Sequence, residues 1–184
     1  MRPAVALLAL LIGGGAAHAQ NKIAEFLPGT PGQKACFART YDARHLREHP
    51  KQRVTSMTFL MRVVGISDSG DWVLDPKEKY DRLSYQFAMD VQRRGEKKAR
   101  TVSGYCPEDS KDTMCARECD GGGVFVEKRD DALIVRLDQW GIRMDSCGEG
   151  DGVWLKPGAD DKMFRLNKVA DAQCKALETE ELGP

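Results

Sequence analysis

The alternation of apolar and polar residues over residues 83–91 constrains this chain more than any other feature. The odd-numbered positions of the segment are all apolar, whereas the even-numbered positions are Ser, Gln, Ala and Asp. A period of two is typical of a β-strand with one buried face. Residues 53–66 repeat the pattern over a longer stretch, with a mixed second face that indicates partial cover. These two segments predict long β-strands.

Shorter apolar runs bounded by turn residues predict further strands. They lie at residues 35–40, 99–106, 124–128, 133–137, 142–147, 153–156 and 163–169, and residues 72–74 form a further short apolar run. Because strands and helices do not alternate, we expect an all-β fold, an antiparallel barrel or sandwich of about eight strands. The long strands favour a closed barrel, since closure removes exposed edges. The strand number is similar to that of lipocalin barrels, an analogy of architecture alone.

Two short helical segments are expected beside the strands. Residues 41–49 suit a short N-terminal helix, because Asp42 can cap its start and Pro50 ends it. Residues 170–177 suit a short C-terminal helical tail, and residues 178–184 are expected to fray. The predicted organisation is an irregular leader at 20–34, a single disulfide-stabilised β domain at 35–177, and a frayed end at 178–184.

The first nineteen residues have the features of a cleaved secretory signal peptide. Arg2 supplies a positive start, residues 4–12 are apolar, and Ala17-His18-Ala19 fits the cleavage rule of small residues. No later segment is long and apolar enough to form a membrane-spanning helix. We therefore expect a periplasmic or secreted protein with no membrane span after signal cleavage.

The charge of the mature chain is balanced. The full sequence contains 28 Lys and Arg residues and 28 Asp and Glu residues, and cleavage removes only Arg2 from this set. A balanced composition gives no general electrostatic reason to bind nucleic acid. Nucleic acid is therefore not an expected partner.

The cysteines predict disulfide bonds. An even number in an exported chain favours bridges over free thiols. Zinc sites use close cysteine pairs, and only the spacing of Cys115 and Cys119 looks like one. We expect at least one bridge within the segment that runs from Cys106 to Cys119. The six candidates are Cys36, Cys106, Cys115, Cys119, Cys147 and Cys174, with Cys36 and Cys174 expected to join the two ends of the barrel.

The run Asp120-Gly121-Gly122-Gly123 admits two interpretations. Successive backbone N–H groups can bind an anion, but the run lacks the Lys-Ser/Thr and the helix of a phosphate-binding loop. The favoured interpretation is that glycine permits a positive φ or a bulge before the next strand. The carboxylate pairs at 130–131 and 160–161 are expected to form turns.

The run His45-Leu46-Arg47-Glu48-His49 resembles the H-x-x-E-H motif of the inverzincin metallopeptidases. The resemblance implies that His45 and His49 bind zinc and that Glu48 is the general base. It covers five residues, in a helix of about two turns with basic flanks. The favoured interpretation is a solvated basic turn of helix. We therefore predict no metal ligands and no catalytic residues.

Aromatic and methionine side chains share one face of the two longest predicted strands. They are Met57, Phe59, Met61, Tyr85, Phe87 and Met89. Such adaptable side chains can line a ligand cavity in a wide barrel. Core packing is the favoured alternative, because eight-stranded barrels can be filled by their own side chains.

These observations favour an exported, non-enzymatic β-barrel of a bacterial periplasm that binds a small apolar ligand or an envelope protein, without a cofactor. A first alternative is an inhibitor of an exported hydrolase, such as a lysozyme or protease, that presents the loop between Cys106 and Cys119. A rigid loop suits that function because preorganisation reduces the entropy lost on binding. A second alternative is a small zinc-dependent hydrolase centred on His45, Glu48 and His49.

Overall fold

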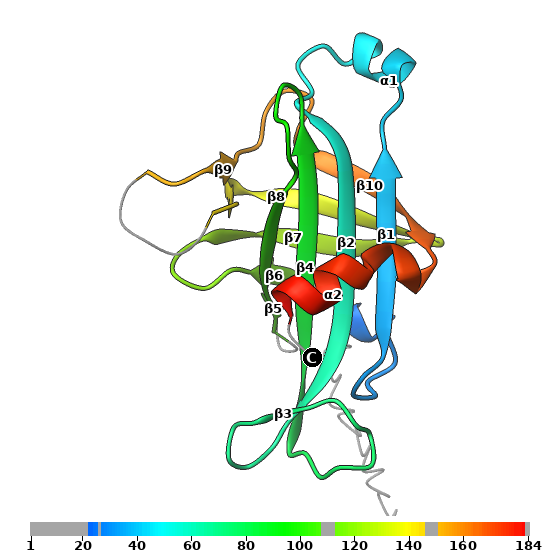
Figure 1. Ribbon diagram of the computed structural model, residues 1–184, viewed down its shortest axis with the longest axis vertical. Helices are drawn as coiled ribbons and strands as arrows, with labels where there is room; N and C mark the ends of the chain where they lie inside the picture. Colours follow the sequence, from blue (N-terminus) through cyan, green and yellow to red (C-terminus); the bar gives the residue numbers. More distant parts are fainter. Residues whose placement is uncertain (1–21, 26, 108–112, 146–150, 183–184) are drawn as a thin grey trace, which may run out of the picture.

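The computed structural model describes residues 22–25, 27–107, 113–145 and 151–182. It is nearly all β (Figure 1). The strands are β1 (Lys34–Thr40), β2 (Val54–Ile66), β3 (Trp72–Val73), β4 (Arg82–Arg93), β5 (Arg100–Cys106), β6 (Met114–Ala116), β7 (Gly122–Arg129), β8 (Ala132–Arg143), β9 (Trp154–Leu155) and β10 (Met163–Val169). The helices are α1 (Ala43–Glu48), α2 (Lys175–Glu181) and two 3-10 turns, η1 (Lys22–Glu25) and η2 (Asp171–Cys174).

Eight of the strands form a closed antiparallel barrel, which confirms the predicted fold class. Their order is β1-β10-β8-β7-β6-β5-β4-β2, and pairing of β1 with β2 closes the ring. The short strands β3 and β9 pair outside this ring, with β2 and β8 respectively. The two long strands expected from the alternation are β2 and β4, which pair along almost their full length.

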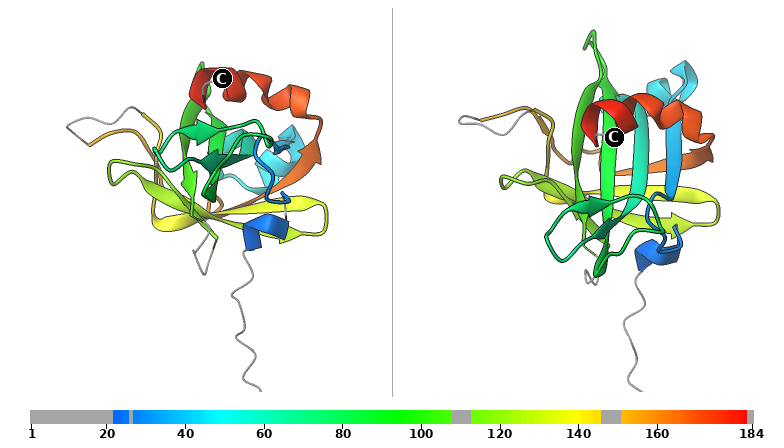
Figure 2. Two further views of the ribbon diagram at one scale, coloured as in Figure 1. Left: turned by 90° about the horizontal axis from the view of Figure 1, so that it is seen from below. Right: turned by 60° about the horizontal axis from the view of Figure 1, so that its bottom comes forward.

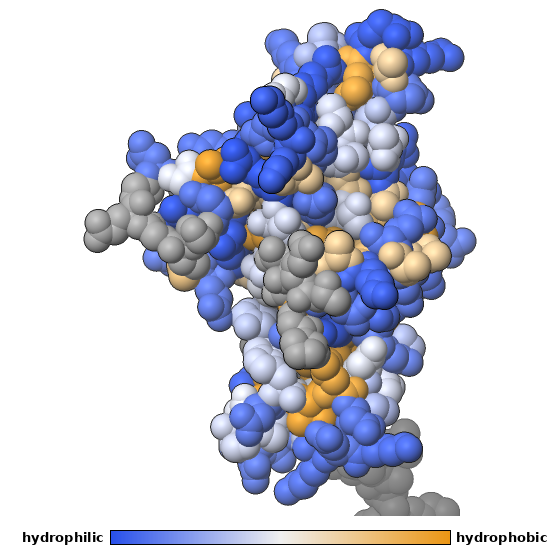
Figure 3. All heavy atoms as spheres, viewed as in Figure 1, coloured by the Kyte–Doolittle hydropathy of each residue, from blue (hydrophilic) through white to orange (hydrophobic). Residues whose placement is uncertain are grey.

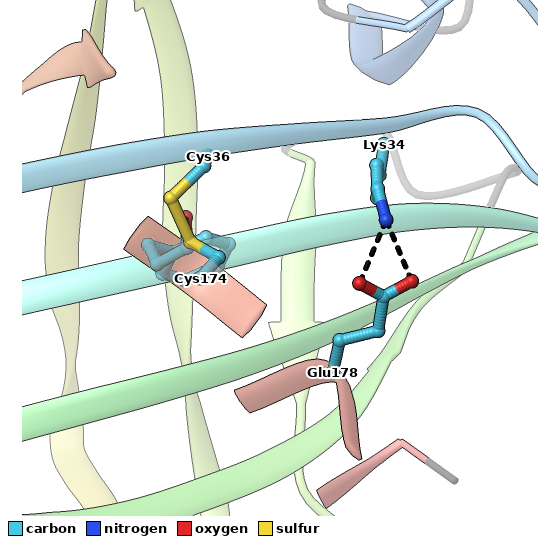
Figure 4. Close-up of a disulfide and its surroundings, with 5 residues drawn as sticks. Lys34, Cys36, Cys174 and Glu178 are labelled. Atoms are coloured by element: carbon cyan, nitrogen blue, oxygen red, sulfur yellow. Dashed lines mark hydrogen bonds and ion pairs between the residues drawn. A yellow bond between two sulfur atoms is a disulfide. The ribbon is translucent and has the colours of Figure 1, made fainter. Parts of the chain in front are cut away.

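Disulfides fasten two seams of the barrel that have few strand pairs. Strands β1 and β10 pair at three residue positions, and β5 and β6 pair at one. Cys36 on β1 is joined to Cys174, which follows β10 in η2 (Figure 4). Cys106 at the end of β5 is joined to Cys115 on β6, with 3.9 Å between their Cα atoms. Both bridges agree with the expectations from the sequence.

The barrel interior is the hydrophobic core. One cluster of buried side chains contains residues from β2, β4, β7, β8 and β10. Ile23 of η1 and Leu27 belong to the same cluster, so the segment expected to be an irregular leader contributes to the core. Figure 2 shows η1 close to one end of the barrel.

The C-terminal helix covers part of the outer face of β1, β2 and β4 (Figure 1). Leu177 of α2 packs with Leu60, Ala88 and the Cys36–Cys174 bridge in a second apolar cluster. The Lys34 ammonium donates to both carboxylate oxygens of Glu178, at 2.8 and 2.7 Å (Figure 4). This helix explains the mixed second face of β2, and it continues to Glu181 instead of ending at residue 177.

The other local differences have physical causes. Residues 142–147 do not begin a separate strand, because β8 continues to Arg143 through Gly141, whose φ of 81° bends the chain. The three-residue strand β6 was not expected, since it lies within the hydrophilic cysteine-rich segment.

Helix α1 has the predicted cap, with the Asp42 carboxylate accepting the N–H of His45. The predicted signal peptide lies outside the described residues.

A search of the described helices for a long, apolar segment of membrane-spanning length found none.

Candidate functional site

The six side chains proposed to line a cavity lie in the packed interior. Each has at most 1% of its surface exposed, so other protein atoms cover it. The rings of Phe59 and Phe87 stack with 5.4 Å between their centroids. A ligand could reach these side chains only by displacing protein atoms. An accessible binding site must therefore lie on the outside of the barrel.

The two histidines of the H-x-x-E-H motif are His45 of α1 and His49, which caps the end of that helix, and their ring centroids lie 4.3 Å apart. Nε2 of His45 lies 3.0 Å from Oε1 of Gln52, and the Glu48 carboxylate accepts a hydrogen bond from Arg44 at 2.9 Å. The N–H of His45 also lowers the pKa of its cap, Asp42. Within the described ranges, no group of three His, Cys, Asp or Glu side chains is placed to hold a metal ion. The geometry gives the zinc-hydrolase alternative no additional support.

The cysteine-rich segment turns sharply where it enters β7. Gly122 has a φ of 68°, and a Cβ atom there would lie 2.1 Å from the Gly141 carbonyl oxygen. The pairing of β7 with β8 shifts register between Gly122 and Val124. The N–H of Gly121 donates to the Glu118 carbonyl within the turn. The glycines thus provide the backbone geometry expected in the favoured interpretation, and Cys119 is part of a further disulfide.

A row of polar side chains crosses the outer face of the barrel beside α2. Arg62 of β2 lies opposite Gln86 of β4, which in turn lies opposite Tyr105 of β5. The Arg62 guanidinium donates to the Gln86 amide oxygen at 2.7 and 3.1 Å and to the Leu182 carbonyl oxygen at 2.8 Å. Burial lowers the pKa of Arg62 from its ordinary value, an effect opposed by the charge of Glu178. This row forms the floor of a surface cleft.

The exposed side chain of Trp72 packs over the Tyr105 end of this row. Strands β2 and β4 extend beyond their last pairs with β1 and β5, and β3 pairs with the end of β2. The twisted extension brings Trp72 of β3 to Tyr105 of β5, where the rings stack with centroids 5.3 Å apart and an interplanar angle of 3°. Trp72 remains 47% exposed. Figure 3 shows a group of apolar atoms at the surface just above the β3 hairpin.

Two clefts flank the aromatic pair, and Trp72, Tyr105 and Glu118 border both. The first, of about 330 Å³, is also lined by Arg62, Leu74, Gln86, Ser103, Gly104, Arg117 and Leu182. The second, of about 460 Å³, is also lined by Ile66, Arg82, Leu83, Ser84 and Pro107. Burial raises the pKa of the Tyr105 phenol, and the charge of Glu118 raises it further. The phenol is therefore a neutral hydrogen-bonding partner at neutral pH. The clefts can therefore bind an apolar or planar group and hydrogen-bond its neighbours.

Sequence reasoning missed most of this site. The sequence indicates Trp72 only as part of a short apolar run, and Tyr105 only as a residue near the end of an expected strand. The available signal was the polar Arg62 on the partly covered face of β2. Pro107, Arg117 and Glu118, by contrast, come from the cysteine-rich segment that the hydrolase-inhibitor alternative invokes.

Comparison with known proteins gave no match to this chain, whether among protein-family models, curated proteins or solved structures.

Proposed function

We propose that this chain is an exported, non-enzymatic binding protein of a bacterial periplasm that holds a segment of an envelope protein on the outside of its barrel. The site is the pair Trp72–Tyr105 with its two clefts. The observation that carries the proposal is the stacked pair of exposed Trp72 and half-buried Tyr105 between two clefts, on a barrel whose interior is filled by its own side chains.

The shape of the site favours a polypeptide segment over a small apolar ligand. Small-molecule pockets bury most of the surface of their ligand, whereas these clefts are open along the barrel wall. Tryptophan, tyrosine and arginine are the residues most enriched among the energetically important contacts of protein interfaces. Trp72, Tyr105, Arg82 and Arg117 supply all three types at one place.

The disulfides and the signal-like first residues support a periplasmic location. Disulfides form and persist in oxidising compartments such as the bacterial periplasm. Cys36, Cys174, Cys106 and Cys115 are all at most 1% exposed, so the bridges are part of the core and its covering. An oxidising location is therefore consistent with the structure, and the periplasm is the proposed one.

A second candidate function is inhibition of an exported hydrolase, and one specific observation favours it. The disulfide-linked segment after β5 supplies Pro107, Arg117 and Glu118 to the clefts. A loop held in this way loses little entropy on binding. Inhibition of a purified lysozyme or protease that is lost on Glu118→Ala would support this function over simple binding.

Selection from a displayed peptide library tests the proposed function. The purified protein is expected to enrich peptides whose affinity falls at least about tenfold with Trp72→Ala, because truncating a central interface aromatic costs more than about 1.4 kcal/mol. Calorimetric titration measures each affinity. The substitution Trp140→Ala is the matched control, since Trp140 is 70% exposed on β8 and lines neither cleft. Peptides that bind the Trp72→Ala protein as well as the unchanged protein would contradict the proposal.

A further inference from the structure

Positive charge is concentrated at the end of the barrel that carries α1. Residues 39–53 and 93–100 together contain ten arginines and lysines but only three carboxylates, a formal excess of seven positive charges. The neighbouring loop at 156–162 adds two lysines and two aspartates and leaves this excess unchanged. We call the surface formed by residues 39–53 and 93–100 the basic end.

The two segments of the basic end are in direct contact. Nη2 of Arg94, in the turn between β4 and β5, donates to the carbonyl oxygen of Leu46 in α1 at 2.6 Å and lies 3.4 Å from that of His49. Both segments therefore lie at one end of the long axis of the molecule, as Figure 1 shows for α1. The surface around α1 is mostly hydrophilic in Figure 3, with a small apolar group among the polar residues. The positive charges thus face solvent at a single end.

Most of these cations are not neutralised by neighbours. Arg44 pairs with Glu48, Arg53 pairs with Asp161, and Arg93 and Arg100 share Glu96. Among the described residues, the other six cations have no carboxylate partner; they are Arg39, Arg47, Lys51, Arg94, Lys97 and Lys98. A shallow cleft of about 520 Å³ between α1 and the β4–β5 turn is lined by Arg47 and Arg94, together with Ala43, Leu46 and Pro50.

The rest of the chain carries the compensating negative charge. The formal net charge of the sequence is zero, so the residues outside the basic end carry a matching excess of carboxylates. Residues 67–82, which include β3 at the opposite end of the molecule in Figure 1, contain five carboxylates and three cations. This separation of charge orients the molecule in front of an extended negative surface, because the attraction acts on one end only.

We propose that the basic end binds the surface of a bilayer that contains anionic phospholipid. The cations are spread over a whole end of the barrel, which matches an extended anionic surface better than a single ionic ligand. Arg47 and Arg94 flank a cleft where a headgroup phosphate can accept their N–H groups, since guanidinium and phosphate are complementary in geometry. Strand β3, which carries Trp72, lies at the other end of the molecule in Figure 1, so a bilayer-bound molecule presents this strand away from the membrane.

Vesicle flotation with the purified chain tests this proposal. Binding is expected to vesicles of equal parts phosphatidylglycerol and phosphatidylcholine, and not to vesicles of phosphatidylcholine alone. The triple substitution Arg47→Gln, Lys97→Gln, Lys98→Gln is expected to lower the partition coefficient about a hundredfold. Each cation that no longer contacts the anionic surface accounts for about a fivefold loss. Salt at about 1 M, where the Debye length is about 3 Å, is expected to release the protein.

The matched control is the triple substitution Lys77→Gln, Lys79→Gln, Lys168→Gln, which removes the same charge from exposed sites outside the basic end. It is expected to leave the partition coefficient unchanged, as is Trp72→Ala, so the result is independent of the proposed peptide site. Thermal unfolding verifies that each variant folds. Equal losses in the two triple variants, or binding to a DNA duplex but not to the anionic vesicles, would overturn the proposal.

Discussion

Replacing both Cys36 and Cys174 by alanine is expected to lower the free energy of unfolding by about 5 kcal/mol in the chain-entropy account of disulfides. The bridge spans 138 residues of sequence, so its removal releases a long loop in the unfolded chain. It also joins β1 to the segment after β10, where the barrel closes through three strand pairs. Loss of the bridge should therefore also loosen α2, which packs against it.

The pair Cys106→Ala and Cys115→Ala is the matched control for this experiment. All four cysteines are at most 1% exposed, but this second bridge spans only 9 residues. The same account gives it about 2.5 kcal/mol. Denaturant unfolding of the two double variants measures the difference. If the Cys106–Cys115 variant proved the less stable of the two, loop closure would not be the main contribution of these bridges.

The substitution Asp161→Ala is expected to destabilise the protein by about 3 kcal/mol, since it leaves buried donors without an acceptor. The Asp161 carboxylate is fully buried and accepts the backbone N–H groups of Arg53 and Val54, at 2.8 and 3.3 Å. It also accepts Nε of Arg53 at 3.3 Å. These contacts tie the loop before β10 to the start of β2, next to the seam where β1 and β10 pair briefly.

The neighbouring residue Asp160 supplies the control, because its carboxylate is less buried and accepts fewer hydrogen bonds than that of Asp161. Asp160 accepts a single backbone N–H, that of Lys51 at 3.0 Å, in an exposed setting. Asp160→Ala is expected to cost less than about 1 kcal/mol, the usual net contribution of one such hydrogen bond. Equal losses for the two variants in denaturant unfolding would show that the buried contacts of Asp161 do not stabilise the closure of the barrel.

The fold class could be predicted because the sequence features that specify its main elements lie within short segments of the chain. Period-two alternation, turn residues and the Asp42 cap are visible in short windows, and they locate β2, β4 and α1. Strand β6 could not be found in this way, since it has three residues and is defined by its neighbours. The continuation of β8 through Gly141 could not be predicted either, because a glycine between polar and apolar residues is typical of the end of a strand.

The candidate site could not be predicted because it depends on tertiary placement. Trp72 and Tyr105 are separated by 33 positions and meet only because the β2–β4 extension twists across the outer face. The aspartates at 160 and 161 look equivalent in sequence, although only Asp161 is buried beneath Arg53. The sequence shows the basic flanks of α1, but their union with residues 93–100 into one basic end depends on the tertiary structure.

We propose that this barrel binds its partner on its outer face and not in its interior. Methyl-labelled methionines report on this directly, because Met57, Met61 and Met89 are interior and are at most 1% exposed. On titration with a selected peptide, we predict that the NMR signal of the Trp72 indole N–H shifts while these three methyl signals do not. Dodecanoate, added as a probe for an apolar ligand, is also predicted to leave the three methyl signals in place. Shifts of the interior methyl signals with an unmoved Trp72 signal would contradict the account.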